Sequence, residues 1–476
     1  MFIGREEQLE QLDALWRKNV ASLVTCRGRR RIGKSTLIEE FARRSRVKFL
    51  KVEGLPPEEG VDNETQLKAF ADQLSEQTGR EIVQPRDWFA AFAILNECIS
   101  PKAKTVVLID EISWMGKVDP AFPAQLKYAW DNRFAKKSKL IVVLCGSVSS
   151  WINEKILKSK GFVGRPSLNL IVPELSIGES RAFWSTRKGG AKIATSEIFD
   201  VLSITGGVPK YLEEVKSVLS ADENIRRMAF IPKSVLASDF DEIFRDVMTG
   251  DIGDRADILR VLSRAPANVS ELAAALGKER NGHLSDALEE LLEAGFVGVD
   301  EGVNPETGKP VQEQRYRLKD NYARFYLKYI EPKMSIIQRG GYQFVSLEQL
   351  PEWDAVKGLA FENLVLNNFR EFLPRLGLER SLVISAAPFR KGTEEKGTGV
   401  QVDLLLQTNR CIYVVEVKRR HEIARKVIDE VDEKVSRIRR RPGIAIKTAL
   451  IYDGHLSKSV EADGYFDAVI DIRDVI

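Results

Sequence analysis

Hydrophobic positions in the first third of the chain fall into two alternating patterns. Ala21–Cys26, Thr105–Ile109 and Leu140–Leu144 are short, mainly apolar runs, typical of strands buried on both faces of a parallel sheet. Val47–Val52 is a further predicted strand. Between them, apolar residues recur with helical spacing, and the predicted helices are Glu6–Arg17, Ser35–Arg44, Glu64–Gln77 and Asp87–Ile99. The alternation predicts an α/β domain with helices on both faces of its sheet.

The pattern changes twice further along the chain. Residues 196–244 have mostly helical spacing, and from Ala256 three helices precede two short strands around Asn304–Pro310, which predicts a winged helix-turn-helix. From about Trp353 the chain mixes helices and strands. The helices expected there are Gly358–Phe372 and Arg425–Arg440, and the strands are Leu382–Ser385, Val400–Leu406, Cys411–Val417 and Lys447–Tyr452.

Composition narrows the class of protein only modestly. The 476 residues exceed the size of one hydrophobic core, so several domains are expected. The net charge of +3 argues against a general polyanion binder. No apolar run is long enough for a membrane span or a secretory signal, so a cytoplasmic protein without a membrane partner is expected. Four scattered cysteines without a CxxC pair argue against a zinc site.

The first candidate site is a phosphate-binding loop of the pattern GxxxxGK[ST]. It follows a predicted strand and opens a helix, which is the context this motif requires. Its glycines let backbone N–H groups turn toward phosphates, Lys34 supplies a cation, and the Ser35 hydroxyl ligates Mg²⁺. Asp110 and Glu111 end another strand, where they would hold the Mg²⁺ and polarise the attacking water, respectively. The predicted ATP-binding loop is Gly28, Arg29, Arg30, Arg31, Ile32, Gly33, Lys34, Ser35 and Thr36.

Other residues near this site leave alternatives open. The three loop arginines would contact phosphate, a neighbouring subunit or DNA, or simply lie in solvent. Ser147 follows a predicted strand, where it would sense the γ-phosphate or merely form a turn. Arg165 would reach the γ-phosphate as an arginine finger or serve a structural role.

These motifs together resemble the archaeal-type ATPases of the STAND branch of AAA+-like P-loop NTPases. The resemblance covers roughly residues 1–220, and its matching segments are Phe2–Glu6, Gly28–Ser35, Leu108–Glu111, Cys145–Ser147 and Gly206–Leu212. It implies that Ile3 and Arg5 lie near the adenine and that Pro209 sits in a helical lid facing the nucleotide. It further implies a winged helix and a C-terminal domain similar to PD-(D/E)XK nucleases.

The resemblance gives a four-part organisation. It comprises a P-loop NTPase core with a parallel sheet, a helical lid, the winged helix-turn-helix, and a C-terminal α/β domain that is restriction-endonuclease-like. The expected boundaries are residues 1–190, 191–250, 251–335 and 345–476.

The second candidate site lies in the C-terminal domain. Glu416 and Lys418 share one face of a predicted strand, and a hairpin turn at 407–410 would put Asp403 opposite Val414, diagonal to Glu416. The carboxylates of Asp403 and Glu416 would hold Mg²⁺ or Mn²⁺, and Lys418 would assist the attack on a phosphodiester. Glu362 on the preceding helix matches the additional acidic ligand of the nuclease pattern, and Gln401 would contact substrate. The alternative is that these are exposed charges on a half-solvated strand.

Charges around the later domains favour nucleic acid as a partner without proving it. Arginines flank the second site at 419–420, 437 and 439–441, where they would contact DNA or merely cap a helix. The third helix of the winged helix is acidic, although Lys278, Arg280 and His283 lie at its start. We therefore expect a packing or relay role for this module rather than sequence reading. The acidic residues are Asp286, Glu289, Glu290 and Glu293.

Two functions follow from the paired sites. The first is an ATP-binding and ATP-hydrolysing switch that controls a Mg²⁺-dependent DNA endonuclease, such as one of a mobile element or a defence system. The second is a regulatory ATPase whose C-terminal domain binds nucleic acid or a partner without cutting. The resemblance also suggests nucleotide-dependent homo-oligomers. Beyond the ATPase motifs, the sequence carries no helicase signature.

Overall fold

The computed structural model describes residues 2–56, 58–146, 149–185, 194–247, 252–280, 282–391 and 399–475. These residues form two compact units. The first consists of Met1–Glu174, Glu242–Ile252 and Glu293–Gly295, and the second of Leu175–Asp241, Gly253–Leu292 and Phe296–Ile476. The finer four-part division stays a prediction.

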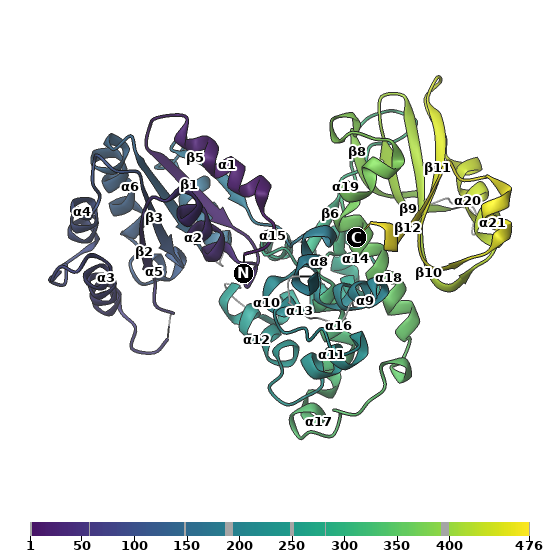
Figure 1. The fold of residues 1–476 in the computed structure, drawn as a ribbon, viewed down its shortest axis with the longest axis horizontal. Coiled ribbons are helices and arrows are strands. Elements are labelled where there is room, and N and C mark those ends of the chain that lie inside the picture. Colours follow the sequence, from purple (N-terminus) through teal and green to yellow (C-terminus); the bar gives the residue numbers. More distant parts are fainter. Residues whose placement is uncertain are drawn as a thin grey trace. The chain divides into compact units, whose positions relative to one another are not determined.

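The first unit is built on a five-stranded parallel sheet of order β2-β3-β4-β1-β5 (Figure 1). The four predicted strands are confirmed, but β5 was not predicted. Only Leu170 is buried in β5, because this strand lies at the sheet edge and lacks a continuous apolar run. The strands are β1 (Ser22–Arg27), β2 (Lys48–Glu53), β3 (Thr105–Asp110), β4 (Leu140–Cys145) and β5 (Pro166–Ile171).

Helices cover both faces of this sheet. One face packs on a large core that contains Trp88, Phe92 and Phe122, with the Trp88 and Phe122 rings 4.9 Å apart. Strand residues such as Val24 and Leu108 are buried outside that core, as are the apolar side chains of the first two helices. The predicted two-sided α/β architecture is therefore confirmed. The helices are α1 (Glu6–Trp16), α2 (Lys34–Ser45), α3 (Asn63–Thr78), α4 (Trp88–Cys98), α5 (Ile112–Val118), α6 (Phe122–Asn132) and α7 (Ser149–Ile152).

The second unit begins with helices, as the sequence predicts. They are α8 (Ile177–Ser185), α9 (Thr195–Thr205), α10 (Pro209–Leu212), α11 (Ala221–Ala229) and α12 (Val235–Val247), whose last residues are assigned to the first unit. Three helices and an antiparallel hairpin follow, which confirms the predicted winged helix-turn-helix fold. Its elements are α13 (Ile252–Arg264), α14 (Val269–Ala275), α15 (Gly282–Glu293), β6 (Val297–Asp300) and β7 (Arg315–Leu318).

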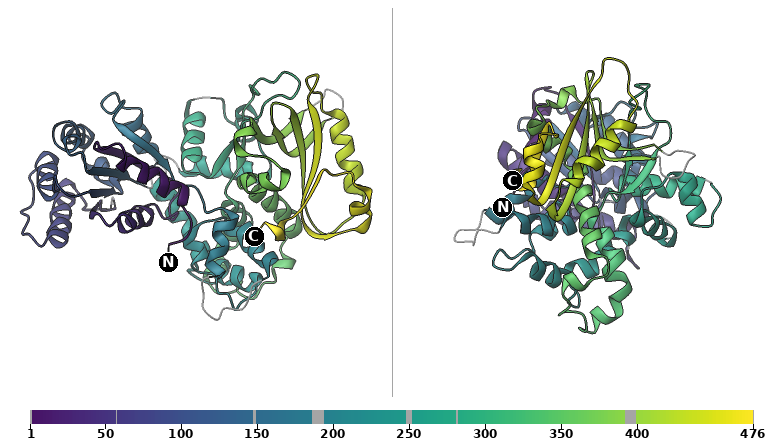
Figure 2. Two further views of the ribbon diagram at one scale, coloured as in Figure 1. Left: turned by 45° about the horizontal axis from the view of Figure 1, so that its top comes forward. Right: turned by 90° about the vertical axis from the view of Figure 1, so that its right-hand side faces the viewer.

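A C-terminal mixed sheet completes the second unit. Its order is β12-β11-β10-β9-β8, with antiparallel pairing among β8, β9 and β10 and parallel pairing among β10, β11 and β12. The helix α20 packs on one face of this sheet (Figure 2), and α18 contacts β10. The elements are α16 (Asn321–Phe325), α17 (Met334–Gln338), α18 (Trp353–Asn367), α19 (Phe369–Phe372), β8 (Ser385–Lys391), β9 (Val400–Gln407), β10 (Cys411–Ile423), α20 (Lys426–Arg437), β11 (Ala445–Leu456), α21 (Lys458–Asp463) and β12 (Ala468–Asp471).

Two predicted elements of this region need correction. The strand expected at Leu382–Ser385 begins only at Ser385, because Arg380–Leu382 forms a 3₁₀ turn. The helix expected at Gly358–Phe372 begins earlier and is interrupted at Asn368, which separates α18 from α19. Within the ranges described above, none of the helices is long and apolar enough to cross a membrane.

Candidate functional site

Two glycines of the phosphate-binding loop have positive φ angles, which glycine adopts without steric cost. Gly28 has φ +150° and an added Cβ would lie 2.5 Å from the Val172 carbonyl oxygen, while Gly33 has φ +84°. Gly33 is the N-cap of α2 and gives that helix no side-chain cap. The first-turn N–H groups of α2 therefore remain suited to binding an anion.

Lys34 and Asp110 both act on the Cys145 thiol at the carboxyl end of β4. The Lys34 ammonium is buried and donates to the carbonyl oxygens of Gly28 (3.1 Å) and Arg29 (3.0 Å). A hydrogen bond with Cys26 and burial raise the pKa of the Cys145 thiol, the Asp110 charge raises it further, and the Lys34 charge opposes this. Both charged groups thus act on the end of β4, the strand between β1 and β3.

Asp110 has the surroundings expected of a Mg²⁺ ligand. Its carboxylate is buried, with one oxygen accepting the Glu111 N–H (3.1 Å) and the other 3.4 Å from the Lys51 ammonium. Burial lowers the pKa of Lys51, but the carboxylates of Asp110, Glu53 and Glu39 together outweigh it and raise the pKa above its usual range. A buried carboxylate balanced by a lysine fits a divalent ion beside bound phosphate. Glu111 itself is half-buried, with a left-handed backbone (φ +45°).

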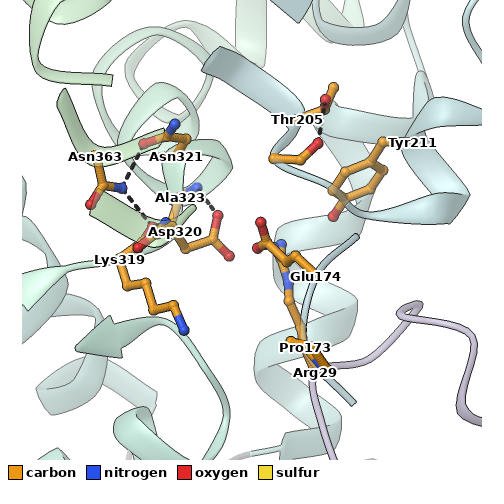
Figure 3. Close-up of polar contacts among 12 residues, drawn as sticks. Arg29, Pro173, Glu174, Thr205, Tyr211, Lys319, Asp320, Asn321, Ala323 and Asn363 are labelled. Atoms are coloured by element: carbon orange, nitrogen blue, oxygen red, sulfur yellow. Dashed lines mark hydrogen bonds and ion pairs between the residues drawn. The ribbon is translucent and has the colours of Figure 1, made fainter. Parts of the chain in front are cut away.

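The three loop arginines contact acidic residues of the first unit. Arg29 forms an ion pair with Glu174 at 3.3 Å (Figure 3), Arg31 pairs with Glu242 at 2.7 Å, and Arg30 donates to the main-chain oxygen of Glu242 at 3.4 Å. These contacts argue against the alternative that the three loop arginines simply lie in solvent. Neither glutamate lies in a motif, so these partners could not be predicted from the sequence pattern.

Arg165 lies at the amino ends of the strands, whereas the phosphate-binding loop lies at their carboxyl ends. It precedes β5, whose Pro166 pairs with Leu23 near the start of β1, whereas the loop follows the end of β1. Its guanidinium forms two contacts with Asp131, at 2.7 and 2.9 Å. The geometry therefore favours the structural role over an arginine finger for the nucleotide of its own chain.

The remaining predicted nucleotide-site residues are placed as follows. Arg5 is buried and its guanidinium donates to the carbonyl oxygens of Ile32 (3.2 Å) and Pro173. Because Ile32 belongs to the phosphate-binding loop, Arg5 stabilises the conformation of that loop. Ile3 and Ser35 are half-buried, and Thr36 is exposed. Ser147 lies outside the described residues. Pro209 is the first residue of α10 in the second unit.

The carboxylate site depends on the register between β9 and β10. The pairs run from Ile412 with Gln407 to Val415 with Leu404, and one further step places Asp403 opposite Glu416. The expected partner Val414 is therefore wrong by two residues, because the turn spans 408–411, where the Thr408 N–H donates to the Cys411 oxygen (2.9 Å). The main-chain N–H of Val417 donates to Asp403 (2.9 Å), so the two strands are joined at the site.

Glu416 is completely buried between two lysines. The Lys418 ammonium lies 2.7 Å from one carboxylate oxygen, and the Lys434 ammonium lies 2.8 and 2.6 Å from the two oxygens. Sequence reasoning missed Lys434. It follows Val427 and Val431 at helical spacing on the inward face of α20, which was the available signal.

Glu362 and Asp403 complete the cluster. Burial raises the pKa of Glu362 to about 7, and the Asp403 charge adds to this effect. Burial likewise raises the pKa of Asp403 to about 6, with the Glu416 charge as the second cause. Burial lowers the pKa of the Lys418 ammonium, but the carboxylates of Glu416, Asp403 and Glu430 together raise it above its usual range. The three carboxylates are thus close enough to repel one another.

The cluster fits a divalent cation in chemistry but not in its present arrangement. Carboxylate oxygens are the ligands that Mg²⁺ and Mn²⁺ prefer, and the repulsion between these groups favours an added cation. Among the described residues, however, no three or more His, Cys, Asp or Glu side chains are already arranged to hold a metal ion. Lys434 occupies both Glu416 oxygens instead, so a metal would require rearrangement. Gln401 is exposed at the start of β9.

Comparison with known families agrees with the nucleotide-site geometry. Residues 2–215 match the model of an ATPase domain predominantly from Archaea. This part of the chain is therefore similar to archaeal-type ATPase domains. Residues 251–299 match the model of a helix-turn-helix domain, as the arrangement of α13 to α15 leads one to expect.

Individual relatives extend the similarity beyond the ATPase domain. The protein named Uncharacterized protein MJECL04, from Methanocaldococcus jannaschii, is 26% identical over 384 residues, which are 79% of this chain and 78% of its own length. The Uncharacterized ATP-binding protein MJ0423 of the same organism is 44% identical over 48 residues, 10% of this chain and 81% of its own.

Solved structures are similar at a lower level. The Walker-type ATPase PABY2304 of Pyrococcus abyssi has 15% identity and a TM-score of 0.47 over 68% of this chain and 96% of its own. The Aeropyrum pernix ORC2 protein in ADPNP–ADP complexes has 16% identity and a TM-score of 0.41 over 70% and 94%.

The wing of the helix-turn-helix domain packs against the C-terminal sheet. The Val303 N–H donates to the Ser385 hydroxyl (3.2 Å), Gln407 donates to the Val303 oxygen, and the Arg441 N–H donates to the Pro305 oxygen (3.2 Å). These contacts lie within the second unit. They favour a packing role for the wing.

Buried amides anchor the same domain after its second wing strand. The Asn363 side chain on α18 donates to the Lys319 oxygen (2.6 Å) and to the Asn321 side chain (2.7 Å), and Asp320 accepts the Ala323 N–H (Figure 3). The cationic start of its third helix is partly neutralised, since Lys278 pairs with Asp254 at 2.5 Å. Both observations support the packing role expected from the acidic third helix.

Proposed function

We propose that this protein is an ATP-hydrolysing switch that controls a Mg²⁺-dependent DNA endonuclease in its C-terminal domain. The observation that carries the proposal is the convergence of Glu362, Asp403, Glu416 and Lys418 on one buried cluster. Buried carboxylates that repel one another are costly to a fold, so they are more often found where function requires them.

In the ATPase domain, the loop and α2 bind the phosphates through N–H groups and Lys34. Asp110 and Ser35 are the residues that would hold Mg²⁺, and Glu111 would orient the attacking water. The ion would neutralise charge that develops between the phosphates. The loop arginines then exchange partners between glutamates and nucleotide phosphate, since both are anionic acceptors.

In the C-terminal domain, Asp403, Glu416 and Glu362 would hold the divalent ion. The ion supplies charge stabilisation and a water of lowered pKa when it is bound. Lys418 lies at the solvent side of the cluster, with a side chain 19% exposed, and donates to the oxygen that carries the developing charge.

DNA is the proposed substrate because the chain combines a helix-turn-helix domain with cationic residues beside the cluster. Arg420 is exposed on β10 two residues after Lys418. Arg439 and Arg440 follow α20, the helix that carries Lys434. Such cations neutralise phosphates without reading bases.

One observation favours a second function, a switch that binds nucleic acid without cutting it. Both oxygens of Glu416 are already bonded to Lys434, which leaves no free oxygen for a metal on that side chain. In this reading the lysines replace the ion permanently and the cluster is structural.

The deciding experiment incubates the full-length protein with supercoiled, linear and branched DNA in Mg²⁺ or Mn²⁺, with and without ATP. Glu416→Gln and Lys34→Ala remove the two sites, and Glu422→Gln, an exposed carboxyl on the same strand, is the matched control. Cutting that survives Glu422→Gln and disappears with Glu416→Gln supports the endonuclease. DNA binding without cutting under every condition, or equal cutting by Glu416→Gln, rejects it.

A further inference from the structure

Two helices near the start of the second unit are bonded directly to its C-terminal domain. At the first turn of α8, the Gly178 N–H donates to both carboxylate oxygens of Glu371, each at 3.2 Å. The adjacent Ile177 N–H donates to Asn368 (3.3 Å). The neighbouring helix α9 packs along α18 (Figure 1). Helix α8, which precedes the predicted lid, and α9, the first helix of that lid, are therefore both attached to the domain that carries the carboxylate cluster.

Arg419 makes the most central of these attachments. Its guanidinium binds Asp200 on α9, donates to the Ser203 hydroxyl on the same helix (3.4 Å), and lies 3.3 Å from Asp453 on β11. Its side chain is only 12% exposed, and that of Asp453 is equally covered. A buried, charge-assisted bridge of this kind holds its partners in one geometry more firmly than a surface pair.

The bridge begins one residue after the proposed reacting lysine. Lys418 and Arg419 are neighbours on β10, and successive side chains of a strand point to opposite faces. One face of β10 therefore presents Glu416 and Lys418 to the cluster, while Arg419 reaches the lid helix. Because a strand transmits a shift along its backbone, movement of α9 displaces the cluster's own strand.

We propose that Arg419 is a positioning residue through which lid helix α9 sets the geometry of the Glu416 and Lys418 pair. The inference rests on the proposed function, in which ATP controls the C-terminal site. Arg419 acts through β10 and does not touch substrate. Its role is to convert a change in the lid into a change in the distance between Lys418 and the carboxylates.

The competing explanation is a purely structural ion pair. Loss of such a pair would lower activity to the same extent with and without ATP. Loss of a positioning contact instead removes the difference between the two conditions. The ratio of the cleavage rates with and without ATP is therefore the quantity to measure, rather than either rate alone.

The variants are Arg419→Met, Asp200→Asn and the charge exchange Arg419→Asp with Asp200→Arg. Arg425→Met is the control, because Arg425 forms an exposed ion pair with Asp463 (3.0 Å) inside the C-terminal domain and has no contact with α9 among those described. We expect the wild type and the control to change cleavage about tenfold with ATP, which is an ordinary allosteric coupling. We expect Arg419→Met to change it less than about twofold, and the charge exchange to restore part of the ratio.

Hydrogen exchange of the β10 peptide, residues 411–423, provides a readout that does not need cleavage. A non-hydrolysable ATP analogue should alter its exchange in the wild type and in Arg425→Met but not in Arg419→Met. If this occurs while no DNA is cut, the endonuclease proposal fails and the coupling stands. If cutting depends on ATP equally in Arg419→Met, the coupling fails and the endonuclease stands. No nucleotide effect on the wild type in either measurement overturns the inference.

Discussion

The carboxylate cluster should release protons when it binds a divalent cation near pH 6. The pKa of Glu362 is raised to about 7 and that of Asp403 to about 6, in both cases chiefly by burial. Carboxyl groups must lose their protons to become ligands. At pH 6, simple titration leaves Glu362 about nine-tenths and Asp403 about half protonated, so roughly 1.4 protons leave per cluster.

The sign of the pH dependence follows from the direction of both shifts. Each folded pKa lies above its ordinary value of 4.5 or 3.8, so the proton stabilises the metal-free folded protein at low pH. That stabilisation is lost as the pH rises from about 4 to about 7. Protons compete with the metal in the same interval. The fraction with both groups ionised rises about twentyfold from pH 6 to pH 8, and metal affinity should rise with it.

Calorimetric titration of the nucleotide-free protein with Mn²⁺, in two buffers of different ionisation enthalpy, counts these protons. Asp110→Asn in the background removes the carboxylate of the nucleotide site. Glu362→Gln should reduce the release at pH 6 to about half a proton, because only Asp403 then titrates. Glu371→Gln is the control, since burial also raises the pKa of that carboxyl. Glu371 lies outside the cluster, on α19, where it accepts the Gly178 N–H at the start of α8. Equal release by wild type and Glu362→Gln, or none at pH 6, would refute the reasoning.

Three further predictions concern residues outside the cluster. Lys34→Ala should lower ATP turnover more than about a hundredfold, measured as phosphate release, because the loop loses its phosphate cation. Gly207→Ala should destabilise the second unit by about 2 kcal/mol in thermal unfolding, since the added Cβ would lie 1.9 Å from the main-chain oxygen of Leu175. Gly358→Ala is its control and should not destabilise the unit, because the space around the added Cβ is open. Arg165→Met should leave ATP turnover of the dilute protein within about twofold and cost less than about 1 kcal/mol of stability, because its ion pair is partly exposed.

Periodicity predicted the elements whose burial is regular and missed those whose burial is not. The central strands β1, β3 and β4 are almost fully buried, so their apolar runs were visible. Edge strand β5 has one buried residue and no such run. The predicted register between β9 and β10 was wrong by two residues, because the register depends on where the turn begins. The hydrogen bonds between Thr408 and Cys411 define that turn, and the sequence pattern does not reveal them.

The candidate sites divide in the same way. Short motifs on a strand, at its end or in the loop that follows it made four site residues recognisable, namely Lys34, Asp110, Glu416 and Lys418. Lys434 was not, since its partner is 18 positions earlier in sequence and on another element. Long-range partners of this kind are set by packing, which a single sequence does not reveal.

The charges of the cluster explain why its metal-free form holds two lysines and why a metal would displace one. Three carboxylates against two ammonium groups leave a single negative charge, which the partial protonation of Glu362 and Asp403 removes at about pH 6.5. If a divalent ion entered the cluster while both lysines stayed and all three carboxylates were ionised, the cluster would carry a buried net positive charge. With Lys434 withdrawn the sum is zero. The cluster therefore has two neutral forms, one with Lys434 and protons and one with a metal. A contact that shifts β10 relative to α20, as Arg419 does from the lid side, acts on the balance between them.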